Sequence, residues 1–381
     1  MAAILHVVNS FFAVRYFIGG QFQYFKKKGH DMHLICPASD LMEPYRREME
    51  FSYTNVEITR TYSLFKDLKA LIAISAYIKK NNIDILVGHT PKGALLAMVA
   101  GWLNKTPKRI YFRHGLVYET ASGLNRKTLV LAEKITSRCS TQVICVSPSL
   151  FNLSIRDNLN PVSKQSILGK GTCGGIDTQN KFNPVKVDRE RISFLRKEYC
   201  ILKDDIVLGF CGRLVRDKGI VELVETLDLL RFRNTGKRFV LLLVGFLETR
   251  DKLPSGLIEK INTDKDIVLT GLIDRDIQNY YALMNIYILP SYREGFGMSN
   301  IEASSMELPV LTTKATGCID SIIENFTGRY IENNPDSIAE GVEFYLNNPD
   351  LAFLYGKNGR DYVVKNFDNL LIWNELENYY C

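Results

Sequence analysis

Short apolar runs alternate with amphipathic stretches along the whole chain, and this rhythm predicts strands and helices in turn. In the first half, strands are expected at Ile4–Val8, His33–Cys36, Ile85–Val87, Arg109–Phe112 and Gln142–Val146, and helices at Leu64–Lys80 and Gly93–Asn104. In the second half, strands are expected at Ile206–Cys211, Phe239–Val244, Ile267–Thr270, Ile286–Leu289 and Val310–Thr312, and helices at 217–231, 275–284 and 299–306. Alternating strands and helices predict parallel sheets with right-handed crossovers. The expected fold class is therefore α/β, with two doubly wound, Rossmann-like domains.

The length of 381 residues also fits two domains better than one. A polar stretch from Phe182-Asn-Pro184 to about Arg196 separates the two apolar rhythms. We place the first domain at 1–185 and the second at 186–365. The last segment, 366–381, is rich in large apolar side chains and is expected to form a helix that packs back on the first domain.

Composition narrows the class of protein. The eight cysteines are scattered, with no C-x-x-C pair and no histidine cluster, which favours small core residues in a reducing compartment over disulfides or zinc ligands. The N-terminal residues read as a buried strand and not as a signal peptide. No window of eighteen apolar residues occurs, so no membrane span is expected. These features predict a cytoplasmic protein.

Positive charge is concentrated in one part of the chain. Residues 61–140 carry thirteen Lys or Arg and four Asp or Glu, which is +9, while the net charge of the whole chain is +6. Such a segment suits an anionic partner, such as a phospholipid surface or a polyprenyl diphosphate, or it is simply a solvated face. The aromatic residues of 11–25, followed by Lys26-Lys-Lys28, suit either a membrane contact or a core helix. No nucleic-acid-binding module is visible, so nucleic acid is not expected as a partner.

The segment 289–303 carries the most suggestive chemistry. A strand ends before Pro290, and Gly295 and Gly297 lead into the next helix. Glycines let the backbone approach a ligand closely, and the helix N-terminus offers free N–H groups to an anion. Glu294 lies at the carboxyl end of its strand, where open α/β sheets bind ligands, and Glu302 follows eight residues later. Two surface glutamates on a capped helix would give the same pattern.

A second segment of the same domain has a similar plan. Its strand is followed by Gly212, and the next turn carries Arg213 and Lys218. Two cations at the carboxyl end of a strand could neutralise a diphosphate, or they could pair with surface acids.

Three segments in the first domain supply further candidates. Gly19-Gly20 follows the first strand and could bring backbone N–H groups near a phosphate. Arg113 and His114 end one strand, and His89 with Lys92 ends another. His114 could hydrogen-bond sugar hydroxyls or titrate near neutrality, or it could have a structural role only. His89, Lys92 and Arg113 are the candidates for contacting an acceptor.

These motifs resemble family 4 of the retaining glycosyltransferases, which have the two-domain GT-B fold with a cleft between the domains. The similarity rests on Arg213-Leu-Val-Arg-Asp-Lys-Gly219, Pro290-Ser-Tyr-Arg-Glu-Gly-Phe-Gly297, Glu302, His114-Gly-Leu-Val, Gly174-Gly-Ile-Asp177 and Thr316-Gly-Cys-Ile-Asp320. The resemblance covers nearly the whole chain. It is closest to the CapM-like branch of the family, which builds capsular polysaccharide, O-antigen and related lipid-linked glycans in bacteria. One departure is Glu307, where the family usually has a small residue at the end of a helix.

The resemblance implies a role for each matching residue. Arg213 and Lys218 would hold the donor diphosphate, Glu294 would face the donor sugar, and Glu302 would bind the ribose. The remaining donor contacts would come from Gly19, Gly20, Gly212, Gly295, Phe296, Gly297, Met298 and Ser299, with His114 touching the sugar. The family usually needs no metal or other cofactor, and no D-x-D motif stands at a strand end.

The resemblance thus implies a hexosyl or N-acetylhexosaminyl transferase (EC 2.4) that uses a nucleotide sugar, with UDP expected and GDP possible. The acceptor would be a polyprenyl-diphosphate-linked saccharide, and the basic first domain would rest on the inner face of the cytoplasmic membrane. Two other functions stay open: a sugar-nucleotide epimerase on the same fold, and a degenerate, non-catalytic assembly scaffold.

Overall fold

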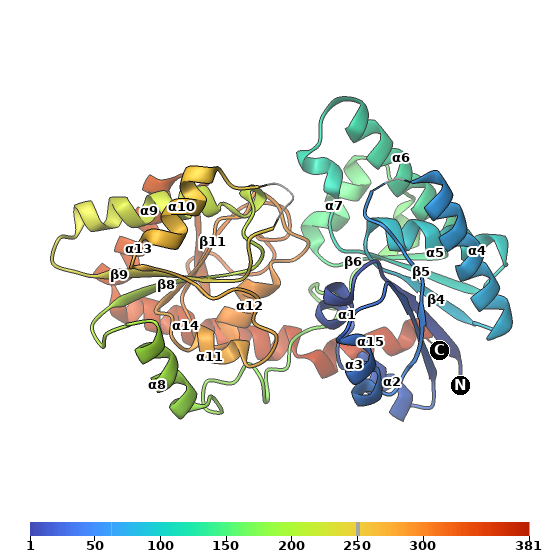
Figure 1. Ribbon diagram of the computed structural model, residues 1–381, viewed down its shortest axis with the longest axis horizontal. Helices are drawn as coiled ribbons and strands as arrows, with labels where there is room; N and C mark the ends of the chain where they lie inside the picture. The colour runs from blue at the N-terminus through green and yellow to red at the C-terminus, as the bar shows by residue number, and fades with distance from the viewer. Residues whose placement is uncertain (62, 249–251, 381) are drawn as a thin grey trace. The chain divides into compact units, whose positions relative to one another are not determined.

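The computed structural model describes all residues of the chain except 62, 249–251 and 381. They form two compact units (Figure 1). Unit 1 is Met1–Gly175 together with the C-terminal residues from Leu370 onward, and unit 2 is Ile176–Asn369. Each unit is built on its own parallel sheet, as the alternation of apolar runs predicts.

The sheet of unit 1 has seven strands in the order β3-β2-β1-β4-β5-β6-β7. They are β1 (Ala3–Val7), β2 (Asp31–Cys36), β3 (Ser52–Asn55), β4 (Ile85–Gly88), β5 (Lys108–Arg113), β6 (Gln142–Cys145) and β7 (Gln165–Ser166). The helices are α1 (Phe11–Phe17), α2 (Gln21–Lys27), α3 (Met42–Met49), α4 (Leu64–Lys80), α5 (Pro91–Leu103), η1 (Val117–Thr120), α6 (Gly123–Cys139), α7 (Pro148–Arg156), η2 (Val162–Lys164) and the C-terminal α15 (Asn369–Tyr380). The strand order changes direction between β1 and β4, which makes this pair the switch point of the sheet.

Alternation along β1 decides which side chains meet which helices. Leu5 and Val7 belong to the core that includes Ile74 of α4 and Ala97 of α5. His6 lies between them in the strand and therefore points to the opposite face, where its ring meets Phe22 of α2.

The sheet of unit 2 has six strands in the order β10-β9-β8-β11-β12-β13, with its switch point between β8 and β11. They are β8 (Ile206–Cys211), β9 (Phe239–Val244), β10 (Ile267–Leu269), β11 (Ile286–Leu289), β12 (Val310–Thr313) and β13 (Gly328–Ile331). The helices are α8 (Arg189–Glu198), η3 (Arg216–Lys218), α9 (Ile220–Arg233), α10 (Ser255–Thr263), α11 (Ile277–Tyr281), α12 (Met298–Ser305), α13 (Pro335–Asn347) and α14 (Pro349–Phe367).

The apolar rhythm misses elements that are short or polar. Strand β3 is not predicted because its sequence, Ser-Tyr-Thr-Asn, lies at the sheet edge and is at most half-buried. A short helix, α1, separates the first strand from Gly19-Gly20, so the glycine pair joins two helices instead of following a strand directly. In α2 the rings of Phe22 and Phe25 are buried. The core interpretation is therefore correct for Phe22 and Phe25, whereas Phe12 and Tyr16 of the same stretch are exposed.

The boundary between the units lies earlier than the proline-containing stretch suggests. Phe182 is buried in unit 2, and its carbonyl accepts hydrogen bonds from Ser305 Oγ at 2.7 Å and Arg360 Nη1 at 3.0 Å. Residues from Ile176 onward thus belong to the second unit and not to the first. Helix α15 packs on the N-terminal unit as expected: its Glu377 pairs with Lys28 at 2.9 Å.

Glu307 ends α12 tightly despite its size. Its φ of 63° lies in the left-handed region that usually takes glycine. The backbone of Gly356 packs against it so closely that a Cβ there would lie 2.1 Å from the Glu307 carbonyl oxygen. The Glu307 side chain pairs with Lys357 at 2.7 Å, so the glutamate anchors α14 at a point where the family usually has a small residue.

Within the described part of the chain, none of the helices has the length and apolar character that crossing a membrane requires.

Candidate active site

The candidate residues of unit 2 come together at its switch point. Strand β8 ends at Cys211 and its neighbour β11 ends at Leu289, and both strands run in the same direction. The two following segments, 212–219 and 290–297, therefore leave the same edge of the sheet side by side. This is the location in open α/β sheets where ligands bind.

The first segment begins with a close backbone contact. Gly212 has a φ of 154°, and a Cβ on Gly245 would lie only 1.8 Å from the Gly212 carbonyl oxygen. The chain then presents Arg213, whose guanidinium Nη1 lies 3.2 Å from Glu248 Oε2. About 42% of the Arg213 side chain is exposed. The arginine is thus held by a carboxylate but remains accessible to a ligand.

Lys218 and Glu294 form an ion pair across the switch point. Both side chains are mostly buried, and Ser291 Oγ donates a hydrogen bond to Glu294 at 3.1 Å. The two residues expected at the donor diphosphate and the donor sugar are therefore in direct contact, although they lie 76 residues apart in sequence.

Further contacts fix the two segments to each other. Tyr292 N donates to the Asp217 carbonyl at 2.9 Å, and Arg293 Nη2 lies 2.6 Å from Asp217 Oδ2. Gly219 has a φ of 71°, and a Cβ there would come within 2.1 Å of the Pro290 carbonyl oxygen. The sequence did not single out Asp217, yet it joins the two motifs by backbone and side chain.

The glycine loop of 294–297 rests on a neighbouring turn. Glu294 N donates to the Thr316 carbonyl at 2.9 Å, and any Cβ on Gly317 would lie 2.6 Å from the Glu294 carbonyl oxygen. Gly297, with a φ of 72°, caps α12, which starts at Met298, one residue earlier than predicted. Phe296 and Ser299 are buried, whereas Gly295 and Met298 are partly exposed.

Glu302 lies on α12 and is 9% exposed. Tyr281 Oη donates a hydrogen bond to Glu302 Oε2 at 2.7 Å. Burial raises the pKa of this carboxyl above its ordinary value, and the hydrogen bond from Tyr281 opposes that rise only in part. A largely buried carboxylate with one oxygen engaged retains acceptor capacity for hydroxyl groups.

The arrangement in unit 2 suits an anionic ligand with attached hydroxyl groups. Two cations stand at one edge of the sheet, each held by a carboxylate that a diphosphate could replace. Replacement of Glu294 by phosphate at Lys218 would release the Glu294 carboxylate for a second part of the ligand.

In unit 1 three histidines gather at the other switch point. His6 Nδ1 lies 3.0 Å from His89 Nε2, and His89 Nδ1 lies 2.9 Å from His114 Nε2. His6 and His89 are buried, whereas His114 is half-exposed and stacks on Phe17 with ring centroids 3.7 Å apart. His89 is therefore not placed to meet an acceptor itself, because it lies beneath His114.

The glycine pair of unit 1 has structural contacts of its own. Gly19 has a φ of 54°, and its carbonyl accepts a hydrogen bond from Tyr45 Oη at 3.1 Å. A Cβ on Gly20 would lie 2.9 Å from Trp373 of α15, so this glycine lets the C-terminal helix approach. Both glycines are partly exposed.

Arg113 and Lys92 are used inside the fold. Arg113 has no exposed surface, and it pairs with Glu133 at 3.2 Å and donates to Ser137 Oγ at 2.7 Å. Its predicted acceptor contact is thus incompatible with its position in the core. The Lys92 side chain is 7% exposed and pairs with Asp67 at 2.6 Å, which leaves it little surface for an acceptor.

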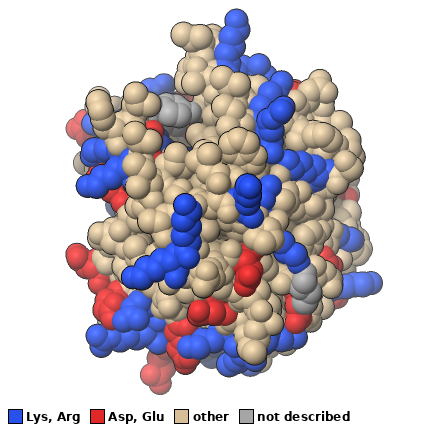
Figure 2. Space-filling view, turned by 90° about the vertical axis from the view of Figure 1, so that its right-hand side faces the viewer, with Lys and Arg blue, Asp and Glu red and all other residues tan. Residues whose placement is uncertain are grey.

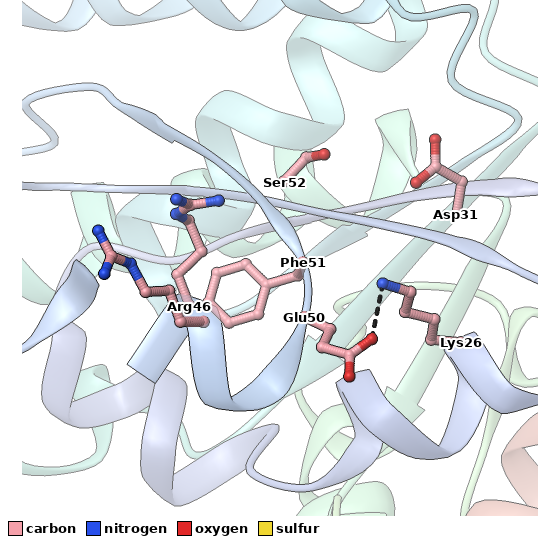
Figure 3. A pocket seen from close by; sticks show the side chains of 7 residues that line it. Lys26, Asp31, Arg46, Glu50, Phe51 and Ser52 are labelled. Atoms are coloured by element: carbon pink, nitrogen blue, oxygen red, sulfur yellow. Dashed lines mark ion pairs between the residues drawn. The ribbon is translucent and has the colours of Figure 1, made fainter. Parts of the chain in front are cut away.

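A shallow hollow of about 380 Å³ lies elsewhere on unit 1 (Figure 3). It is next to Asp31 and Ser52, the first residues of β2 and β3, and so at the opposite edge of the sheet from His114. Lys26 reaches Glu50 at 2.9 Å, and Arg46 is held by Glu43 at 2.6 Å. Lys26 and Glu50 pair within the hollow, and its two arginines pair with Glu43 outside the lining. The cations that line the hollow therefore already have carboxylate partners, which argues against a second ligand site.

Comparison with known proteins identifies the family. Residues 3–147 match the family described as Glycosyl transferase 4-like, and residues 192–362 match Glycosyl transferases group 1. The capsular polysaccharide biosynthesis glycosyltransferase CapM of Staphylococcus aureus is 33% identical over 95% of this chain and 92% of its own length. The chain belongs to the group 1 glycosyltransferases. The predicted resemblance is thereby confirmed over nearly the whole sequence.

A further sequence relative agrees with this assignment, and solved structures share the fold. The UDP-Gal:alpha-D-GlcNAc-diphosphoundecaprenol alpha-1,3-galactosyltransferase of Escherichia coli is 26% identical over 91% of this chain and 88% of its own. Among solved structures, HepE of Anabaena in complex with UDP and glucose superposes with a TM-score of 0.83, at 16% identity over 99% of both chains. WaaG, a glycosyltransferase involved in lipopolysaccharide biosynthesis, gives 0.74 at 16% identity over 99% of both chains. The predicted GT-B fold is confirmed.

Proposed function

We propose that this glycosyltransferase moves one sugar from a UDP-sugar to a polyprenyl-diphosphate-linked saccharide, with retention of configuration, during synthesis of a bacterial surface polysaccharide. The observation that carries the proposal is the ion pair of Lys218 and Glu294 at the switch point of unit 2, with Arg213 and Glu302 on the same unit. The names of the galactosyltransferase of E. coli and of HepE with UDP support the acceptor and the nucleotide class.

On the donor side, the diphosphate takes the place of carboxylates. Lys218 leaves Glu294, Arg213 leaves Glu248, and both cations then face the phosphate oxygens. Glu294 becomes free to accept hydrogen bonds from hydroxyls of the donor sugar. Glu302, which Tyr281 orients from one side, accepts hydrogen bonds from the ribose hydroxyls.

The transfer step is a front-side substitution. The bond between the anomeric carbon and the diphosphate oxygen breaks, and the acceptor oxygen bonds to that carbon on the same face. The acceptor's hydroxyl proton passes to the departing diphosphate oxygen. Arg213 and Lys218 stabilise the negative charge that develops on that oxygen. Because the diphosphate oxygen accepts the proton, the reaction requires no side chain to act as a base.

Donor binding and turnover separate this function from its two rivals. We expect titration calorimetry to show binding of UDP, and we expect a labelled donor incubated alone to remain unchanged. An epimerised donor in the absence of any acceptor would favour the epimerase. Absence of nucleotide binding would favour the non-catalytic scaffold.

Unit 1 also carries a surface suited to a membrane. Large apolar side chains are exposed along α4 and at the end of α5, among them Leu64, Phe65, Ile72 and Trp102. Between these helices lies a groove of about 480 Å³, lined by Leu68, Leu71, Ile72, Ser75, Ala76, Lys79 and Leu103. Figure 2 shows lysine and arginine side chains projecting from a largely uncharged face, with acidic side chains toward its lower edge. Apolar side chains with basic neighbours suit the surface of an anionic bilayer.

A phenylalanine on each unit tests this contact. Phe65 of α4 is 86% exposed and Phe232 of α9 is 83% exposed, so they differ in position but not in accessibility. Phe65→Asp should weaken binding to vesicles with anionic lipid about tenfold or more, because burying a Phe side chain contributes roughly 1.5–3 kcal/mol. Phe232→Asp should leave vesicle co-sedimentation unchanged. Equal binding by both variants and the unsubstituted protein would contradict the assigned surface.

A further inference from the structure

The row of three histidines in unit 1 follows from strand register. His6 pairs with Val87 across β1 and β4, so His89 lies two residues beyond the level of His6. Gly88 pairs with Tyr111 across β4 and β5, so His114 lies two residues beyond the level of His89. Steps of two residues keep all three side chains on one face of the sheet. The three histidines therefore extend from the buried interior of unit 1 to the carboxyl edge of its sheet.

The inner end of this row is closed. His6 Nε2 is buried and has no hydrogen-bond partner among the described residues. Its surroundings are the rings of Phe22 and Tyr380, with centroids 5.5 and 6.5 Å from that of His6. The hydroxyl group of Tyr380 is likewise buried without a partner among the described residues. The hydrogen bonds of the row therefore end at His6 within the described residues.

Hydrogen-bond geometry then limits the row to two arrangements. Burial lowers the pKa of His6 to about 3, and it lowers the pKa of His89 and of His114 below the ordinary value, which favours the neutral form of each ring near neutral pH. A neutral imidazole has one donor and one acceptor nitrogen. Two links among three rings therefore require that every ring carries its proton on Nδ1, or that every ring carries it on Nε2.

The buried end decides between the two arrangements. With all protons on Nε2, His6 would bury an N–H group that has no acceptor among the residues the structure describes. With all protons on Nδ1, His6 buries only a bare nitrogen lone pair. Orphaned buried N–H groups are the rarer of the two in proteins. The Nδ1–H arrangement also points the Nδ1–H of the half-exposed His114 outward.

We propose that His6 and His89 are positioning residues that fix His114 as a neutral Nδ1–H hydrogen-bond donor to a substrate hydroxyl oxygen and prevent it from acting as a base. This inference rests on the proposed function, because it assumes that the ligand at His114 is a sugar. It assigns no proton transfer to the histidine, in agreement with a diphosphate oxygen that receives the acceptor's proton.

Nitrogen NMR of histidine-labelled protein tests the arrangement directly, because the chain has five histidines. We expect His89 and His114 to carry hydrogen on Nδ1 and a bare Nε2, with no titration between about pH 5 and 8, where an ordinary histidine changes charge. Hydrogen on His114 Nε2, or titration of His114 in that range, would overturn the proposal. This spectrum can be read whether or not the protein transfers sugar, so its failure is distinct from failure of the proposed function.

Two variants of His89 add a kinetic readout. His89→Asn places an amide N–H at the position of Nδ1–H and keeps the donor to His114, whereas His89→Leu removes it. A net hydrogen bond contributes about 1 kcal/mol, so we expect His89→Leu to raise KM about fivefold to tenfold with kcat little changed. His89→Asn should restore KM to within about twofold, on the same scale. An equal loss in both variants would show a merely structural role for His89 and would refute the positioning role.

Discussion

Replacing Lys218 by alanine should lower kcat by about 10²–10³, because the loss of one preorganised charge at a developing anion costs roughly 3–4 kcal/mol of transition-state stabilisation. Lys218 is one of two residues, with Asp217, whose side chains join the two motifs of unit 2, and it is the cationic one. The variant also leaves Glu294 without its cation at the place where the diphosphate binds, so electrostatic repulsion adds to the loss. Turnover of a UDP-sugar with a lipid-linked acceptor is the measurement.

The matched control is Lys260→Ala. Lys260 also forms a close ion pair with a carboxylate in unit 2, that of Asp228, but this pair lies on α9 and α10 and away from the strand ends. It should keep nearly full activity, since an exposed pair contributes about 1 kcal/mol or less to stability and nothing to the site. Near-normal turnover of the Lys218 variant, with the same thermal midpoint as the control, would refute its assignment.

Glu302→Gln should have a different kinetic signature. The amide still accepts the hydrogen bond from Tyr281, but a charged acceptor for the ribose is lost. Hydrogen bonds to charged groups contribute about 1.5–3 kcal/mol, so we expect the donor KM to rise about tenfold to a hundredfold with a smaller change in kcat. Tyr281→Phe, which removes only the orienting hydroxyl, should give a milder rise. A Glu302→Gln variant with unchanged donor KM would contradict ribose binding.

The Glu302→Gln substitution should stabilise the unliganded protein although it weakens donor binding. The pKa of Glu302 is raised in the folded protein, so its ionised form is less favourable there than in the unfolded chain. The folded state is therefore penalised increasingly as pH rises through the folded pKa, and glutamine removes that penalty. Near neutral pH, Glu302→Gln should raise the thermal midpoint, as measured by calorimetry of the unliganded protein. In the unsubstituted protein, donor affinity should fall as the pH is lowered and Glu302 becomes protonated. Because the pKa of Glu302 is raised, this fall should occur at a higher pH than it would for an ordinary glutamate.

The apolar rhythm predicts the strands that position the site, because β8 and β11 are continuous apolar runs buried on both faces. It also predicts that Arg213, Lys218 and Glu294 lie at strand ends. It does not predict that Lys218 and Glu294 pair, because that contact depends on β8 and β11 being neighbours at the switch point. Strand order is a property of long-range packing and leaves no mark in local sequence.

The misassigned residues of unit 1 have a common cause. Arg113 ends β5, and Lys92 lies in the first turn of α5 just after β4, which are places where ligand-binding residues occur. Each has a carboxylate partner distant in sequence: Glu133 for Arg113 and Asp67 for Lys92. A position near the end of a strand can be predicted from the sequence, but the direction in which the side chain points cannot. His6 was missed for the converse reason, since it sits inside an apolar strand. Its sequence signal is a polar residue on the face of β1 opposite to Leu5 and Val7.

Retaining transfer to a lipid-linked saccharide can be observed in a single reaction. The protein is incubated with a panel of UDP-sugars and extracted polyprenyl-diphosphate-linked saccharides, and the products are analysed by mass and by proton NMR of the new linkage. We expect an acceptor heavier by one hexose or N-acetylhexosamine residue, with the anomeric configuration of the donor. A product of inverted configuration, or acceptors that stay unchanged while a donor is bound, would contradict it.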